Sequence, residues 1–233
     1  MLHGPVLQIV NVRKNYQALR PLRVRALAIA PGERIAISGL DAGAAEVLVN
    51  LVTGASVPDE GEVTVLGRTT ASIADGEEWL ASLDRFGIVS PRAVLLDSAT
   101  LLQNLAMPFT LEIDPVPPGA ASRAEALAAE VGLAADALLQ PIARLTPEIR
   151  IRAHLIRAIA LNPQLLILEH PTAGLPDSDR QTFGRDVARL AEARSLATLI
   201  ISQDREFSRA AAHRTLALNG ATGELRRTRG FLR

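Results

Sequence analysis

Several short segments of this sequence are apolar along their whole length, and segments with a helical pattern alternate with them. The apolar runs lie within residues 34–40, 84–90, 164–170 and 197–204. A strand that is apolar on both faces must be covered on both sides, which is typical of a mostly parallel sheet flanked by helices. The sequence therefore predicts an α/β fold. Ligands of such folds bind beyond the carboxyl ends of the strands, and these ends carry Gly39, Ser90, Glu169 and Gln203.

Other parts of the chain predict additions to this sheet. Shorter β segments are expected within residues 6–12, 22–30 and 58–68, and hairpin-like β structure within 213–225. Helices are expected at 145–163, between Thr146 as cap and Pro163, and at 180–194. An Ala-rich helical pattern at 101–139, broken by a Pro-rich turn at 114–119, predicts a helical insert. We therefore expect a single domain over residues 1–233 with a helical subdomain at about 98–160.

The overall charge and hydropathy exclude some classes of protein. Lys plus Arg and Asp plus Glu both number 25, so the formal net charge is +0, which argues against binding nucleic acid by bulk charge. The sequence has no cysteine. It shows no signal-peptide pattern and no apolar run of about 18 residues that would span a membrane. A cytoplasmic protein is expected.

The segment RIAISGLDAGAAEVLVNLVTG, residues 34–54, predicts a strand, a loop of small residues and a helix over residues 46–53. This is the pattern of a phosphate-binding loop, in which backbone N–H groups surround the phosphates, a lysine neutralises them and a Ser or Thr hydroxyl binds Mg²⁺. Here Ala45 stands in the place of the lysine and Glu46 in the place of the hydroxyl. Lys14 is the only lysine of the chain, so no neighbouring lysine can substitute. The predicted, degenerate nucleotide site comprises Gly39, Leu40, Asp41, Ala42, Gly43, Ala44, Ala45, Glu46 and Val47.

Several other segments occur in an order that carries a family resemblance. They are KNY at residues 14–16, PGERIAISG at 31–39, PDEGEVTVLG at 58–67 and AIALNPQLLILEHPTAGL at 158–175. Together they resemble the nucleotide-binding subunit of an ABC transporter over nearly the whole chain. The resemblance implies a P-loop NTPase-like fold with an antiparallel β subdomain and a helical insert. It also implies ATP and Mg²⁺ as cofactors and Tyr16 as the aromatic residue that stacks on adenine.

The positions at which this family carries its catalytic groups differ in this chain. Glu169 stands where the family has its metal-side Asp and is the candidate metal ligand, but His170 replaces the glutamate that polarises water. Pro91 stands where the family has a Gln, Gln203 where it has the switch histidine, and Pro176 where it has an Asp. These losses imply that hydrolysis is weak or lost, and no catalytic residue is assigned.

The family's signature LSGGQ, which faces the γ-phosphate held by a partner subunit, corresponds here to Leu145, Thr146, Pro147, Glu148 and Ile149. Thr146 keeps a hydroxyl. Pro147 lacks an N–H group, and Glu148 adds a negative charge. We therefore interpret this segment as signature-like but degenerate.

Some residues have two interpretations. Tyr16 is either an adenine contact or a core residue at a strand end. Glu169 is either a residual metal ligand or a cap of a buried strand. Arg150, Arg152 and Arg157 are interpreted as a solvated helix face rather than as an anion site.

The resemblance implies a degenerate subunit that is a structural or regulatory partner of an integral membrane permease. It would dock through residues 91–109 and the helical insert and lie peripherally on the membrane, and a second nucleotide-binding subunit would complete a hetero-complex. Binding of ATP and Mg²⁺ is expected to be weak or absent. One alternative is an active ATPase with an unusual base such as His170, which exports lipid, lipoprotein or drug-like substrates. Another is a soluble assembly factor on the same fold.

Glu46 and Glu148 suggest how such a fold could be completed without a ligand. We expect each to lie in the first turn of a helix whose family relatives offer that turn to a phosphate. A helix N-terminus carries unpaired N–H groups and a partial positive charge, so a carboxylate there is stabilising. The hypothesis is that both glutamates replace the missing phosphate, and the alternative is drift to a tolerated residue.

Overall fold

The computed structural model describes residues 4–73 and 75–228, so the first residues of the N-terminal stretch lie outside it. Within that part of the chain, the larger sheet has the strand order β10-β9-β3-β8-β7-β6. Its neighbours pair in parallel except for β10, which is antiparallel to β9. The strands are β3 (Arg34–Ser38), β6 (Phe86–Val89), β7 (Leu165–Glu169), β8 (Ala197–Ile201), β9 (Arg214–Leu218) and β10 (Leu225–Arg227).

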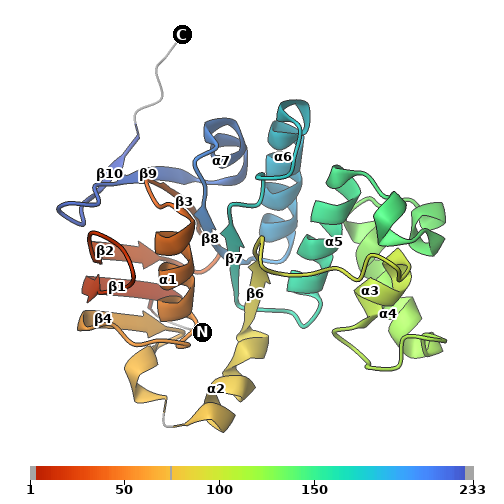
Figure 1. Ribbon diagram of the computed structural model, residues 1–233, viewed down its shortest axis with the longest axis horizontal. Coiled ribbons are helices and arrows are strands. Elements are labelled where there is room, and N and C mark those ends of the chain that lie inside the picture. Colours follow the sequence, from red (N-terminus) through yellow and green to blue (C-terminus); the bar gives the residue numbers. More distant parts are fainter. Residues whose placement is uncertain (1–3, 74, 229–233) are drawn as a thin grey trace.

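A smaller antiparallel sheet lies at one end of the molecule, with the order β2-β1-β4-β5 (Figure 1). Its strands are β1 (Leu7–Lys14), β2 (Leu22–Ile29), β4 (Glu60–Val65) and β5 (Arg68–Thr69). Helix α1 (Ala42–Val52) packs between this sheet and the larger one, because its apolar face joins Ile9 and Ile37 in one hydrophobic core. Leu48 and Val52 of α1 are buried in that core.

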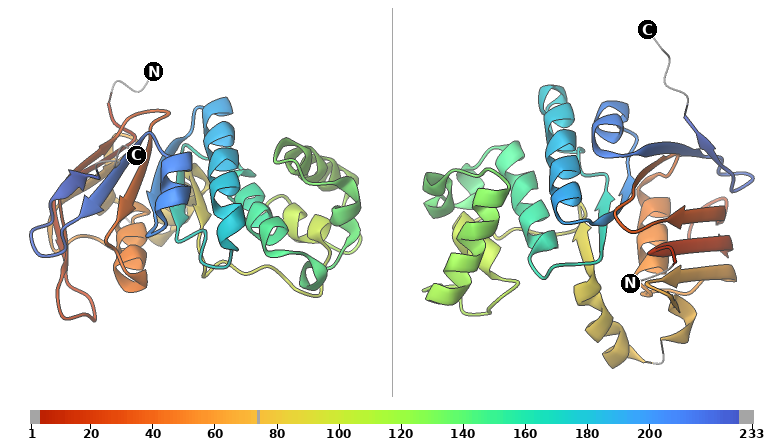
Figure 2. Two further views of the ribbon diagram at one scale, coloured as in Figure 1. Left: turned by 90° about the horizontal axis from the view of Figure 1, so that it is seen from above. Right: turned by 180° about the vertical axis from the view of Figure 1, so that it is seen from behind.

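A second core covers the other side of the larger sheet. It is formed by α5 (Pro147–Ile159), α6 (Asp177–Ala193) and α7 (Arg205–Ala211), and Phe183 stacks on Phe207 at 5.6 Å between ring centroids. Helices α3 (Leu101–Ala106) and α4 (Pro118–Glu130) continue this core at the end of the molecule opposite to the small sheet (Figure 2). Short 3-10 turns complete this region at Ala135–Leu139 and Ile142–Arg144.

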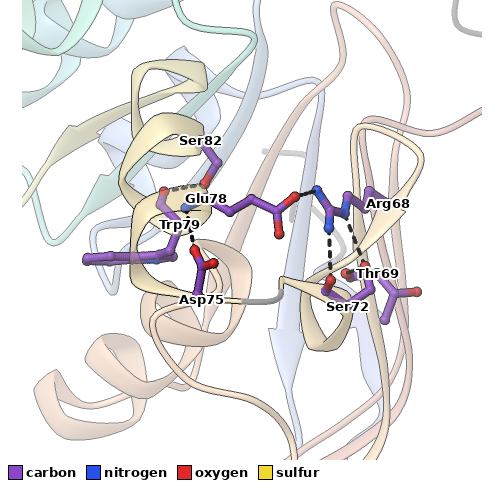
Figure 3. A network of polar contacts seen from close by, with 7 residues as sticks. All are labelled: Arg68, Thr69, Ser72, Asp75, Glu78, Trp79 and Ser82. Atoms are coloured by element: carbon purple, nitrogen blue, oxygen red, sulfur yellow. Dashed lines mark hydrogen bonds and ion pairs between the residues drawn. The ribbon is translucent and has the colours of Figure 1, made fainter.

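Helix α2 (Gly76–Ser82) is joined to the small sheet by polar contacts rather than by a core (Figure 3). Arg68 of β5 donates to Ser72 of the 3-10 turn Thr70–Ser72, with Nε 3.1 Å from Oγ, and pairs with Glu78 of α2. Trp79 Nε1 donates to the Thr53 carbonyl at 3.0 Å. A further turn, Leu83–Arg85, leads into β6.

The predicted α/β fold with a mostly parallel sheet and a small antiparallel sheet is confirmed. Some boundaries differ from the prediction. Helix α6 begins at Asp177 rather than 180, and α2 and α7 were not predicted. Strand β6 lies at the sheet edge, and Gly87 and Val89 are buried while Phe86 and Ile88 are half-buried. The subdomain boundaries at about 98–160 stay a prediction. Among the described residues, no helix combines the length and apolar character needed to cross a bilayer.

Candidate functional site

The loop between β3 and α1 is closed by contacts from within the chain. Gly39 has φ +91°, and a Cβ at this position would lie 2.6 Å from the Leu218 carbonyl oxygen, so only glycine fits. The Gly39 N–H donates to Gln203 Oε1 at 3.2 Å, while Gln203 Nε2 donates to the Leu40 carbonyl at 2.8 Å. Gln203, from the segment after β8, therefore holds both sides of the turn.

The N-terminus of α1 is capped by Asp41. Its carboxylate accepts a hydrogen bond from the Ala44 N–H at 2.8 Å, and the helix begins at Ala42. The prediction that the helix begins at Glu46 and that Glu46 lies in its first turn is therefore wrong. Asp41 is a favoured N-cap residue that uses one of the otherwise unpaired N–H groups, so the helix extends into the stretch that a phosphate-binding loop would leave open.

Tyr16 covers the beginning of α1. A ring carbon of Tyr16 lies 3.6 Å from the position of a Cβ built on Gly43, and the side chain packs partly against the core around α1. Burial raises the pKa of the Tyr16 phenol, and the negative charge of Asp41 raises it further. The ring is thus near both the helix cap and the predicted loop, and its contact with adenine stays a prediction.

Glu169, at the carboxyl end of β7, is paired with an arginine. Its side chain is 1% exposed, and both carboxylate oxygens accept from Arg92, at 2.7 Å from Nη1 and 2.7 Å from Nη2. Nη1 of Arg92 also lies 3.5 Å from an oxygen of Glu46. One guanidinium group therefore lies between the carboxylate expected to hold the metal and the carboxylate that replaces the metal-binding hydroxyl.

His170, Pro91, Leu145 and Pro147 are brought together around a cavity of about 490 Å³ between the end of β6 and the start of α5. His170 has φ +42°, and its N–H donates to the Ile201 carbonyl at 2.8 Å. Its buried Nε2 atom has no hydrogen-bond partner among the described residues. The cavity is therefore lined by the signature-like segment and by the residue that replaces the family's general base.

The start of α5 is closed by local groups. Thr146 is the N-cap and Pro147 the first helical residue, but the Thr146 side chain makes no capping bond to the helix. Glu148 accepts from the Thr146 hydroxyl and from its own N–H, which lowers the pKa of the Glu148 carboxyl. Glu148 therefore lies in the first turn, as predicted for this helix.

The interpretation of the α5 arginines as a solvated face is wrong for Arg152, whose side chain is 19% exposed, whereas Arg150 keeps 39% of its side chain exposed. Nε of Arg150 donates to the Leu145 carbonyl at 3.2 Å, and Nη1 of Arg157 donates to the Val94 carbonyl at 2.7 Å. Arg152 pairs with Asp186 at 2.7 Å. Arg152 and Arg157 thus join α5 to α6 and to the loop after β6, whereas Arg150 binds the segment directly before α5.

The donor set does not match that of a Mg²⁺–nucleotide site. Mg²⁺ requires oxygen ligands and keeps several waters, whereas Glu169 has both oxygens bound by Arg92. No group of three acidic or histidine side chains that could hold a metal occurs in residues 4–73 and 75–228. The Ala44 N–H, which a phosphate-binding loop would offer to an anion, is bound to Asp41. Groups of this chain therefore bind both carboxylate oxygens of Glu169 and the Ala44 N–H.

Comparison with known protein families identifies the family of this chain. A family profile described as "ABC transporter" matches residues 22–173, more than half of the chain. The chain belongs to the ABC transporter family. This ABC-family chain is 30% identical to the lipoprotein-releasing system ATP-binding protein LolD of Pseudomonas syringae pv. tomato, with 88% of this chain and 91% of the relative covered. It is 30% identical to LolD of Pseudomonas fluorescens, with 78% and 80% covered.

Solved structures share the fold of this ABC-family chain. The dimeric structure of MJ0796, a bacterial ABC transporter cassette, has a TM-score of 0.75 at 21% identity, with 97% of this chain and 100% of that chain covered. CbiO1 from Clostridium perfringens, part of the ABC transporter complex cbiONQ, has a TM-score of 0.79 at 18% identity, with 96% and 87% covered. At these identities the likeness concerns the fold.

Sequence reasoning missed Arg92. Pro91 stands where the family has a Gln, and Arg92 is the next residue, at a position to which the family resemblance assigns no role. Asp41 was included in the loop but not recognised as its cap. A signal was present in both cases. An Asp directly before a run of small and apolar residues is a candidate N-cap, and a carboxylate at the end of an apolar strand needs a compensating partner.

Proposed function

We propose that this chain is an ABC-type subunit in which ATP hydrolysis is lost or very slow, and that it serves as a structural or regulatory partner in a transport complex. The observation that carries the proposal is the bidentate pair between Arg92 and Glu169. A carboxylate bound in this way is not free to orient a metal ion. Ala45 in place of the lysine and Gln203 in place of the switch histidine support the same conclusion.

The chemistry of phosphoryl transfer explains the size of the expected effect. Catalysis depends on positioned charges, and removal of one electrostatic donor costs about 10² to 10³ in rate. This chain lacks several such groups together. Purified protein is expected to hydrolyse Mg-ATP no faster than a blank without protein, measured by phosphate release. The matched control is a preparation of His170→Ala: phosphate release that is equal in both preparations comes from a contaminating ATPase, whereas release that only the parent shows comes from this chain.

Nucleotide affinity is expected to be low as well. The lysine is missing, and Glu46 lies close to where phosphate would lie. We therefore expect a dissociation constant of about 1 mM or higher for Mg-ATP, which corresponds to a binding free energy of about 4 kcal/mol or less in magnitude. Isothermal titration calorimetry measures this directly. Micromolar affinity would contradict the proposal, because it would require a phosphate site that Asp41 and Arg92 do not close.

The relatives suggest the kind of complex. The LolD proteins are named for a lipoprotein-releasing system, so we propose a permease-bound complex of this type, with this chain peripheral on its cytoplasmic side. Residues 91–109 and the helices that follow are the proposed docking region.

A second, active nucleotide-binding subunit is also proposed, because a homodimer would pair two altered loops with two altered signature segments. Formation of ATP-dependent dimers by this chain alone, measured by size-exclusion chromatography, would contradict the hetero-complex. Genes for a permease and a second ATPase beside this gene would support the hetero-complex.

One observation favours a second candidate, an active ATPase. The Nε2 atom of His170 is buried and unpaired within the described residues, and a neutral imidazole can accept a proton. Phosphate release above background that disappears in His170→Ala would establish this alternative. In that case the exported substrate class would be lipid, lipoprotein or drug-like.

A further inference from the structure

The guanidinium of Arg92 occupies a position between two carboxylates from different elements. Glu169 ends β7 and Glu46 lies on α1, and the two would repel each other and destabilise the fold if left alone. Within the described residues, Arg92 is the one cation paired with Glu169. A carboxylate that is 1% exposed must be compensated, because the desolvation of an unpaired charge costs several kcal/mol.

Arg92 also belongs to a loop that is held from both sides. The loop follows β6 and leads to α3. On the side of the helices, Arg157 of α5 binds the Val94 carbonyl at 2.7 Å, and the Asn104 side chain of α3 accepts from the Leu96 N–H at 2.8 Å. On the side of the sheet, Arg92 binds Glu169. The loop thus joins the carboxyl edge of the sheet to the helical region without a ligand.

We infer that Arg92 is a built-in cation, which neutralises Glu169 and Glu46 in place of Mg²⁺ and holds the loop after β6 against β7 permanently. Arginine suits this role, because its planar guanidinium binds a carboxylate with two parallel bonds and stays charged at all accessible pH values. The pairing therefore does not depend on nucleotide or on metal concentration. The inference deepens the proposed function by giving the site a fixed rather than a ligand-dependent state.

The decisive experiment removes the internal cation and supplies an external one. Thermal melting is followed for the parent, Arg92→Ala and Arg92→Ala/Glu46→Gln, with MgCl₂ or MnCl₂ against NaCl of equal ionic strength. The parent should not respond specifically to either divalent cation. Arg92→Ala should melt lower, and about 10 mM divalent cation should raise its melting temperature by about 3 °C, because the freed carboxylates can share the ion. The double variant should lose most of that rise.

Arg227→Ala is the matched control. It removes the same charge from β10, at the edge of the sheet opposite to β6, where Arg227 is exposed. It should melt like the parent and stay indifferent to divalent cations. An equal cation response in the parent or in Arg227→Ala would overturn the inference, and so would an Arg92→Ala variant that folds but does not respond.

A second variant covers the case in which Arg92→Ala does not fold. Arg92→Ala/Glu169→Gln removes the unpaired buried charge together with its partner. It should fold and melt above Arg92→Ala, without a divalent-cation response. A double variant that also fails to fold would contradict the inference, because the loss would then come from packing and not from charge. Phosphate release by the parent tests the proposed function separately, so either idea can fail alone.

Discussion

The starts of α1 and α5 are the two helix N-termini that the family resemblance assigns to phosphate, and they are closed in different ways (Figure 1). At α1, the helix cap is the Asp41 carboxylate, Gln203 from beyond β8 binds the turn, and Tyr16 from beyond β1 covers the first turn. At α5, Thr146 and Glu148 bond within the same few residues. The start of α5 also borders a cavity of about 490 Å³.

The two helix starts therefore differ in which parts of the chain contact them. The α1 site is closed by residues far apart in sequence, so its closure is part of the tertiary fold. The α5 site is closed by local bonds near the surface. We therefore expect substitutions around the start of α1 to lower the free energy of unfolding more than substitutions at the start of α5.

The largest effect is expected for Arg92→Ala. Removal of one partner from a buried ion pair costs 3–5 kcal/mol in general, and the value here should be about 3 kcal/mol because Arg92 is partly exposed. The exposed Glu46→Gln change should cost less than about 1 kcal/mol. Urea denaturation measures both. If Arg92→Ala lowered the free energy of unfolding no more than Glu46→Gln does, the ion pair between Arg92 and Glu169 would not be a main stabilising contact.

The next effect concerns the helix cap. Asp41→Ala should lower the free energy of unfolding by about 1 kcal/mol, since a capped N–H group becomes unpaired. Asp41→Asn is the matched control and should retain most of the stability, because an amide oxygen can accept the same bond from Ala44. If Asp41→Ala were neutral, the closure of the α1 site would depend on Gln203 and Tyr16 alone.

The sequence allowed the sheet to be predicted because continuous apolar strands and their flanking turns are local patterns. The start of α1 was not predicted correctly from the sequence. Small residues at 42–45 are compatible with both an open loop and a helical turn, and the Asp41 cap decides between them. Helix α7 was missed although Asp204 caps it through the Phe207 N–H at 3.0 Å, because the helix is short.

The contacts that close the α1 site could not be predicted from local patterns. Arg92 and Glu169 are 77 positions apart in the chain, and Gln203 lies 164 positions from Gly39. Their pairing depends on how the strands order in the sheet, which places the ends of β6, β7 and β8 beside one another. A motif comparison could report which family residues are absent, but not which new side chains occupy their places.

Titration can separate the two sites. Burial, followed by the charge of Arg157, lowers the pKa of His154 on α5 below its usual 6.5. A lowered pKa in the folded state contributes stability that is present above pH 6.5 and is lost as pH falls. At the α1 site, the pKa of Tyr16 is raised above 10.0, so its contribution is present below pH 10.0 and is lost as pH rises.

The unfolding free energy should therefore have an acidic limb that flattens in His154→Gln and an alkaline limb that flattens in Tyr16→Phe. Chemical denaturation across pH measures both limbs. Each variant is the control for the other, because the α1 substitution should leave the acidic limb unchanged and the α5 substitution should leave the alkaline limb unchanged. A single substitution that altered both limbs would show that the two sites are coupled.

The smallest effect is expected for Glu148→Gln at the start of α5. The lowered pKa of Glu148 means that its ionised form stabilises the fold above the usual glutamate pKa and that this contribution is lost in acid. The side chain is half-buried at the start of α5, and solvent screening reduces the stabilising contribution of its charge to about 0.3 kcal/mol. Gln keeps an oxygen that can accept a hydrogen bond from Thr146, which reduces the loss of stability further.

Urea denaturation measures this effect at low salt and in about 1 M NaCl, at which surface charges are screened. The free energy of unfolding of Glu148→Gln should be slightly below that of the parent at low salt and equal to it at high salt. A salt-independent cost as large as that of Asp41→Ala would break the comparison, because it would mean that the start of α5 is closed as firmly as the start of α1.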